Sequence, residues 1–210
     1  PQAALAQLNA ASKLVEGIAH FRGRPYREDE AWRVNYALVN TTVQDSVRVM
    51  ADNIHPPLWQ IVAEVWVHVV GQNEVVTRFM SILLSCLSLA LVFRLGADLF
   101  GVRVGLVSAV LLGTLPAFQF YSTEFRPYAA LIAATLALAL VYLRWLRRPT
   151  FAGALRVVGT ALTAIYIHTI SLFMLPALFL FTLLFVRRSA AVYGRALGLF
   201  ILVGIGCLGW

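Results

Sequence analysis

The sequence predicts an all-α, polytopic integral membrane helix bundle of about six spans, preceded by amphipathic or juxtamembrane helices. Hydrophobic residues make up 60% of the 210 residues, and the mean hydropathy is +0.78. This composition exceeds the roughly half-apolar usage of soluble domains. Charged residues make up only 13%. From Val75 onward they fall in short clusters between long apolar runs, as expected for bilayer-spanning helices of roughly 20 apolar residues.

The net charge of +7 does not indicate a nucleic-acid partner. The arginines lie in short turns between apolar segments, where the positive-inside bias of membrane proteins places them. Cys86 and Cys207 both lie inside apolar segments, so neither a disulfide framework nor a metal-binding spacing is expected.

The chain divides into two predicted regions. Residues 1–74 are expected to form an extracytoplasmic polar segment with interfacial helices, and residues 75–210 a transmembrane bundle. The chain begins at Pro1 and ends at Trp210 within an apolar run, so we expect a truncated part of a longer polypeptide.

Short helices are expected in the first region. Gln2–Phe21 has apolar residues at helical spacing, interrupted by polar ones, which is typical of a helix lying in the membrane interface. A second short surface helix is expected in Ala31–Met50. Leu58–Val70 is apolar but short for a span, and we predict a helix at the interface or entering the membrane shallowly. Its Glu64 and His68 are expected to face a polar interface.

Helix length predicts where the second region turns back. About 40 residues separate Arg103 from Arg144, and as one helix they would extend ~60 Å, twice the ~30 Å hydrocarbon core. The polar stretch "YSTEFRPY" at Tyr121–Tyr128 is the predicted turn, and the next apolar run is predicted to turn at His168–Ser171. The predicted spans are Val75–Leu95, Val104–Phe120, Tyr128–Trp145, Val157–Ile167, Leu172–Val186 and one from Leu197 onward.

This scheme sorts the charged residues onto two faces. The arginines of the other turns fall together on a face predicted to be cytoplasmic, namely Arg94, Arg103, Arg144, Arg147, Arg148, Arg187, Arg188 and Arg195. The N-terminal polar segment, Glu124, Arg126 and His168 fall on the opposite, extracytoplasmic face. Ionisable groups near a membrane are functional candidates, because they are costly unless paired or hydrated.

Separate segments supply the candidate site residues on this outer face. A carboxylate there could act as general base on an acceptor hydroxyl, and an arginine could bind a phosphate through two hydrogen bonds. Aromatic rings suit a sugar or a membrane interface equally well. The candidates are Asp29, Glu30, His55, Arg78, Glu124, Arg126, Tyr128 and His168.

Each candidate also has a structural interpretation that the residues alone leave open. Asp29 and Glu30 could be solvated acids at a helix start, and Glu124 with Arg126 could form an ion pair within a loop. Arg78 could simply extend its guanidinium group to the interface. The histidine at the second turn could serve hydrogen bonding within that turn.

Four motifs occur in order along the chain: "DEAW" at Asp29–Trp32, "HPPLW" at His55–Trp59, "LFGVRVG" at Leu99–Gly105 and "YSTEFRPYA" at Tyr121–Ala129. Their succession resembles the GT-C glycosyltransferases, and more narrowly the protein O-mannosyltransferase and lipid A aminoarabinose transferase branch. Corresponding stretches in that branch read approximately "DEAW", "HPPLYYLL", "LFG-R-G" and "YSQEARMYAL". The resemblance covers roughly Arg27 to Val186.

The resemblance implies an inverting enzyme of the bacterial inner membrane. Such enzymes move a sugar from a polyprenyl-phosphate donor to a protein, lipid or glycan hydroxyl on the extracytoplasmic face. The family's catalytic acid maps onto Asp29, with Glu30 as its neighbour, and the acid of the last motif maps onto Glu124. Arg126 maps onto the following arginine, which would contact the donor phosphate. A divalent cation, Mg²⁺ or Mn²⁺, is left open as a cofactor, with Asp29 and Glu124 as its candidate ligands.

The chain also departs from the family pattern. Thr123 stands where glutamine is common, Pro127 alters the start of the following helix, and the span expected before "DEAW" is replaced by an amphipathic stretch. The alternative function is therefore a non-catalytic structural subunit with partner membrane subunits. A small-molecule transporter is disfavoured, because it would place charged groups near the membrane midplane.

Overall fold

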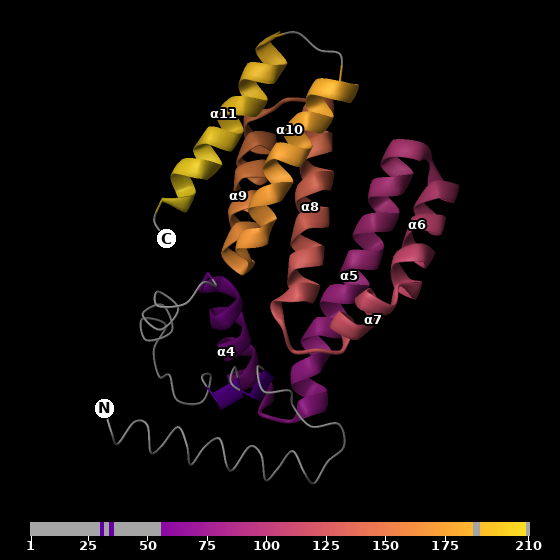
Figure 1. The fold of residues 1–210 in the computed structure, drawn as a ribbon, viewed down its shortest axis with the longest axis vertical. Coiled ribbons are helices and arrows are strands. Elements are labelled where there is room, and N and C mark those ends of the chain that lie inside the picture. The colour runs from indigo at the N-terminus through magenta and orange to yellow at the C-terminus, as the bar shows by residue number, and fades with distance from the viewer. Residues whose placement is uncertain (1–29, 32–33, 36–55, 187–189, 209–210) are drawn as a thin grey trace.

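The computed structural model describes residues 30–31, 34–35, 56–186 and 190–208, and in these ranges the chain is helical without strands. The all-α prediction is confirmed. Gln2–Phe21 lies outside the described residues, and so does most of Ala31–Met50, of which Ala31, Val34 and Asn35 are helical. The helices are α4 (Leu58–Val70), α5 (Glu74–Phe100), α6 (Val102–Thr114), α7 (Pro116–Ser122), α8 (Pro127–Arg147), α9 (Phe151–Ile167), η1 (Thr169–Phe173), α10 (Met174–Phe185) and α11 (Ala190–Cys207) (Figure 1).

Three helices in the described part, α5, α8 and α11, are long and apolar enough to cross a membrane. A fourth span results if α6 and α7 are taken together. Helices α9 and α10 have 17 and 12 residues, so they are short for a span and the count of six stays a prediction. Many large apolar side chains on these helices are exposed, including Leu111, Leu184 and Ile201, as expected for surfaces that face lipid.

Helix α5 begins and ends at recognisable caps. The side chain of Asn73 accepts a hydrogen bond from the backbone N–H of Val75 at 3.0 Å, which satisfies one of the free N–H groups of the first turn. The helix ends at Gly101, whose φ of +98° is a conformation that side-chain-bearing residues rarely adopt. The chain then reverses directly into α6.

The glycines of the "LFGVRVG" region let α5 and α6 pack in backbone contact. A Cβ atom on Gly105 would lie 2.5 Å from the carbonyl oxygen of Phe93, and one on Gly96 would lie 2.9 Å from the Cα of Gly105. Neither position can accept a side chain without moving a helix. The third motif therefore encodes a tight helical hairpin, in which Gly101 makes the turn and Gly105 makes the contact.

The predicted single span Val104–Phe120 is wrong in one respect, because it is broken. Helices α6 and α7 meet at Leu115 with a bend of 70°. Leu115 is extended, with φ −65° and ψ 123°, because it precedes Pro116, and a residue before proline is pushed out of the helical region. Pro116 then starts α7 at a position where its missing N–H is not needed.

The two predicted turns are confirmed. The chain reverses between α7 and α8 through residues 123–126, and between α9 and α10 through His168 and η1. Helices α8, α9, α10 and α11 enclose the larger apolar core, whose buried members include Leu138, Tyr142, Trp145, Val157, Ala161, Leu178, Leu199 and Val203. Within this core the Tyr142 hydroxyl lies 2.7 Å from the Thr182 hydroxyl.

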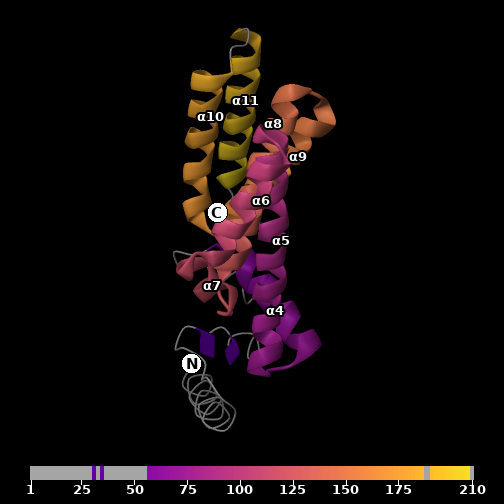
Figure 2. The ribbon, with the colours of Figure 1, turned by 90° about the vertical axis from the view of Figure 1, so that its right-hand side faces the viewer.

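The bundle has two chemically different ends. At the upper end in Figure 1 lie the α5–α6 and α8–α9 turns and the start of α11, and at the lower end lie α4, α7 and the start of α8. Figure 2 shows α10 and α11 together on one side of the bundle. At the upper end Asp98 of α5 binds Arg94 at 3.0 Å and Arg144 of α8 at 3.0 Å. Arg94 and Arg144, two of the arginines predicted to share one face, therefore lie together at this end, and the assignment of the whole set to the cytoplasm stays a prediction.

Candidate functional site

Glu30 connects separate segments of the chain at the lower end of the bundle through its carboxylate. Its carboxylate is fully buried and forms a two-point ion pair with Arg78 of α5: the Arg78 Nη2 atom lies 2.9 Å from Oε2 and the Nε atom lies 3.3 Å from Oε1. The Arg78 side chain is only 13% exposed. The interpretation that Arg78 merely reaches the interface is therefore wrong, because its guanidinium group turns inward to the carboxylate.

The same carboxylate binds the loop that carries the last motif. Glu30 Oε1 accepts a hydrogen bond from the backbone N–H of Phe125 at 2.6 Å. One turn after Arg78, the Ser81 hydroxyl donates to the carbonyl oxygen of Glu124 at 2.6 Å. Two hydrogen bonds thus hold adjacent residues of the loop, one from the N-terminal segment and one from α5.

Apolar side chains pack beside these contacts of Glu30, Arg78 and Ser81 with the loop, which we call the Glu30 junction. The rings of Trp59 and Phe125 lie 6.0 Å apart at an angle of 55°, and both side chains are buried. They belong to a small core with Val34, Ala63, Val67, Met80 and Ala130, which joins the N-terminal segment, α4, α5 and α8. An ion pair shielded from water by such a core is far less screened than a surface pair.

Beyond the loop, aromatic rings connect the start of α8 to the α9–α10 turn. The Arg126 guanidinium carbon lies 5.0 Å from the centre of the Tyr128 ring, a cation–π distance. Tyr128 in turn lies 4.4 Å from the Tyr121 ring and 5.9 Å from the His168 ring. Glu124, two residues before Arg126, is fully buried.

His168 serves the turn that it occupies. Its Nδ1 atom accepts a hydrogen bond from the Ile170 backbone N–H at 3.3 Å, which caps η1. The ring is half-buried and faces Tyr128. His168 therefore forms a hydrogen bond within its turn and also lies beside the other site residues.

The structure brings six of the eight predicted residues together in one continuous set of contacts. Glu30 contacts Arg78 and Phe125, which lies between Glu124 and Arg126, and Tyr128 links Arg126 to His168. Asp29 and His55 lie outside the described residues. Asp29 directly precedes Glu30, and His55 directly precedes Pro56, the first described residue of its segment.

Sequence reasoning missed two members of this junction. Ser81 lies three residues after Arg78 on the same helix face, and that spacing was a usable signal. The backbone N–H of Phe125 carries no such signal. Glu64 corrects a further expectation, because it is buried and accepts a hydrogen bond from Gln60 at 3.3 Å instead of facing a polar interface. His68 is exposed, and its Nδ1 lies 2.8 Å from the Glu64 carbonyl oxygen.

No group of three or more His, Cys, Asp or Glu side chains that could hold a metal ion occurs among the described residues. Glu124 alone supplies one carboxylate, and its candidate partner Asp29 is outside those residues. A divalent cation between Asp29 and Glu124 therefore stays a prediction.

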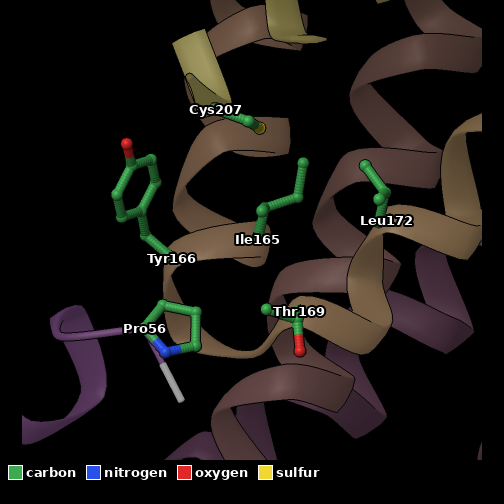
Figure 3. A pocket seen from close by; sticks show the side chains of 6 residues that line it. All are labelled: Pro56, Ile165, Tyr166, Thr169, Leu172 and Cys207. Atoms are coloured by element: carbon green, nitrogen blue, oxygen red, sulfur yellow. The ribbon is translucent and has the colours of Figure 1, made fainter. Parts of the chain in front are cut away.

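An apolar cavity of about 140 Å³ lies near this end of the bundle, where α9, η1 and α11 meet (Figure 3). Figure 3 shows the side chains of Ile165, Thr169, Leu172 and Cys207 around it, with Pro56 from the segment before α4. The cavity lies beside the α9–η1 turn that contains His168. Its lining offers almost no polar surface, so it suits hydrocarbon and not a sugar.

These features define a membrane-embedded helical protein with a cluster of acidic, basic and aromatic residues at one end. The family model of the dolichyl-phosphate-mannose-protein mannosyltransferases matches residues 54–210, and the chain belongs to this family of membrane glycosyltransferases. The resemblance inferred from the four motifs is confirmed. No curated protein and no solved structure matched the chain.

Proposed function

We propose that this protein transfers a sugar from a polyprenyl-phosphate donor to an acceptor hydroxyl at the end of the bundle that carries Glu30, with inversion at the anomeric carbon. The observation that carries the proposal is the Glu30 junction. One buried carboxylate fixes the "DEAW" segment, α5 and the "YSTEFRPY" loop to one another, so residues of both motifs meet at one site. This end is the extracytoplasmic one in the proposed topology, in a bacterial inner membrane.

Asp29 and Glu30 have different roles in this proposal. The Glu30 carboxylate accepts hydrogen bonds from Arg78 and from the Phe125 backbone, so it acts as a positioning residue. Asp29, its neighbour in sequence, is the general base. It removes the proton from the acceptor hydroxyl as the oxygen attacks the anomeric carbon and the bond from that carbon to the phosphate oxygen breaks. The polyprenyl phosphate leaves with the electron pair of that bond.

The donor phosphate is assigned to the start of α8. Arg126 caps this helix in an extended conformation, with φ −135° and ψ 162°. The first turn of α8 carries the positive end of the helix dipole, which favours an anion there. A guanidinium group beside that turn adds charge-assisted hydrogen bonds to the phosphate oxygens. The ring of Tyr128 suits the sugar, and the apolar cavity beyond His168 suits part of the polyprenyl chain.

The test compares two adjacent carboxylates in the full-length protein, reconstituted in nanodiscs with polyprenyl-phosphate mannose and a hydroxyl acceptor. Asp29→Asn is expected to lower transfer at least about 100-fold, the usual contribution of a general base, without changing thermal stability. Glu30→Gln is expected to lower stability and activity together. Full activity in Asp29→Asn would refute the base assignment.

The same experiment addresses the alternative of a non-catalytic subunit. That alternative expects no transfer with any polyprenyl-phosphate sugar, and stable co-purification with partner subunits that is indifferent to substitution of Asp29 or Glu124. A transfer activity that depends on Asp29 excludes it.

A further inference from the structure

The upper end of the bundle, where Asp98 binds Arg94 and Arg144, carries a groove that the proposed transfer reaction does not use. It lies between the α8–α9 turn and α11 and has a volume of about 550 Å³, within the ~300–1,000 Å³ range of ligand pockets. Its lining is mainly apolar and includes Trp145, Phe151, Leu199 and Leu202. Arg195 of α11 is its one charged lining residue.

Arg195 is an exposed cation near the start of a candidate span. It lies about five residues, or roughly 8 Å of helix rise, inside α11, which is one of the candidate spans. Within the described part of the chain, Arg195 forms no ion pair or hydrogen bond. This contrasts with Arg144 at the same end, which donates two hydrogen bonds to Asp98. Arg195 is exposed, so its guanidinium group is accessible to a negative group at the membrane boundary.

Two glycines give the groove its shape. A Cβ atom on Gly153 would lie 2.8 Å from Cδ1 of Trp145, so the glycine lets the indole ring pack against the start of α9. Gly198 lines the groove one turn after Arg195, and a Cβ atom there would meet nothing within 4 Å. The groove therefore has open space directly beside the arginine.

From this geometry we infer that the groove binds an anionic phospholipid. The phosphate of the headgroup pairs with Arg195, and an acyl chain lies along the apolar lining. Charge complementarity selects this occupant, because the groove combines one cation with hydrocarbon-compatible walls at a bundle end that bears further arginines. Basic pockets between membrane helices are established headgroup-binding environments.

The test measures lipid retention by native mass spectrometry of the full-length protein released from nanodiscs that contain equal phosphatidylglycerol and phosphatidylcholine. Wild-type protein is expected to retain phosphatidylglycerol selectively. Arg195→Gln is expected to lower that retention about fivefold, the contribution of one arginine near a lipid headgroup. Gly198→Leu fills the groove and is expected to lower it at least as much, with thermal stability unchanged.

Arg103→Gln is the matched control, because Arg103 is exposed in the first turn of α6 at the same end and does not line the groove. It removes the same charge and is expected to leave retention unchanged. Equal losses in Arg103→Gln and Arg195→Gln would overturn the inference, because general electrostatics would then explain binding. Unchanged retention in Gly198→Leu would also overturn it, as would displacement of the lipid by millimolar inorganic phosphate, which would indicate a simple anion site.

Discussion

Replacing Arg78 by methionine tests whether the Glu30 junction holds the lower end of the bundle together. Methionine keeps much of the apolar stem, but it removes both hydrogen bonds to a carboxylate that is 0% exposed. Breaking a buried ion pair by removing one partner typically destabilises a protein by about 3–5 kcal/mol. We expect a loss of about 3 kcal/mol, because Glu30 keeps the hydrogen bond from the Phe125 N–H.

Glu30→Gln provides the second arm of a double-mutant cycle. The glutamine oxygen can still accept from Phe125, and the amide group of glutamine keeps an oxygen that can accept from Arg78. We therefore expect the smaller loss of about 1–3 kcal/mol that accompanies one impaired buried hydrogen-bonding group. In the double variant no uncompensated charge remains at the junction. Its destabilisation should fall short of the sum of the single effects by at least about 1 kcal/mol.

The free energy of unfolding would be measured by steric trapping in bicelles, where the protein stays in a lipid environment. Thermal denaturation in detergent gives a second readout, in which 1 kcal/mol corresponds to a shift of roughly 2–4 °C for a chain of this size. A coupling energy below about 0.5 kcal/mol would refute the reasoning, because residues in direct contact within one network exceed that value. Glu30 and Arg78 would then be neighbours without being a structural pair.

Three further predictions follow from other parts of the bundle. Asp98→Asn is expected to destabilise the protein by less than about 1 kcal/mol in the same assay, because its ion pairs are exposed, and the difference should shrink at high salt. Gly105→Ala is expected to lose about 1–3 kcal/mol by forcing α5 and α6 apart, whereas Gly159→Ala, where a Cβ meets nothing within 4 Å, should be neutral or slightly stabilising. Arg126→Gln is expected to raise the KM for the polyprenyl-phosphate donor about tenfold and leave the acceptor KM unchanged, which initial-rate kinetics would check.

The helices and the two reversals were predictable because their signals are local. The length of each apolar run between arginines determines whether that run crosses the membrane once or must turn back. The polar stretch at Tyr121–Tyr128 marks one such reversal. The break at Leu115 also had a local signal in Pro116, which a count of span lengths overlooks. A proline rule applied inside each apolar run would have found it.

The internal arrangement of the site was less predictable, because its contacts join distant parts of the chain. Glu30 meets Arg78 across 48 residues and Phe125 across 95 residues. Periodicity describes one helix at a time, so it cannot tell whether an arginine near a helix start reaches water or a buried carboxylate. The family motifs named segments that the fold brings together, but only the fold shows that Glu30 is buried and paired with Arg78.

The two ion-pair clusters of α5 are separated by about the thickness of the hydrocarbon core. Arg78 and Asp98 are about 20 residues apart, which corresponds to roughly 30 Å of helix rise and matches the thickness of the hydrocarbon core. If Asp98 and its arginines lie at one membrane boundary, the Glu30–Arg78 pair lies at the other. The polyprenyl-phosphate donor of the proposed reaction would hold its phosphate at that same boundary, with its chain in the hydrocarbon. The start of α8 and Arg126 can therefore meet the phosphate without drawing it into the membrane interior, where an unpaired charge is costly.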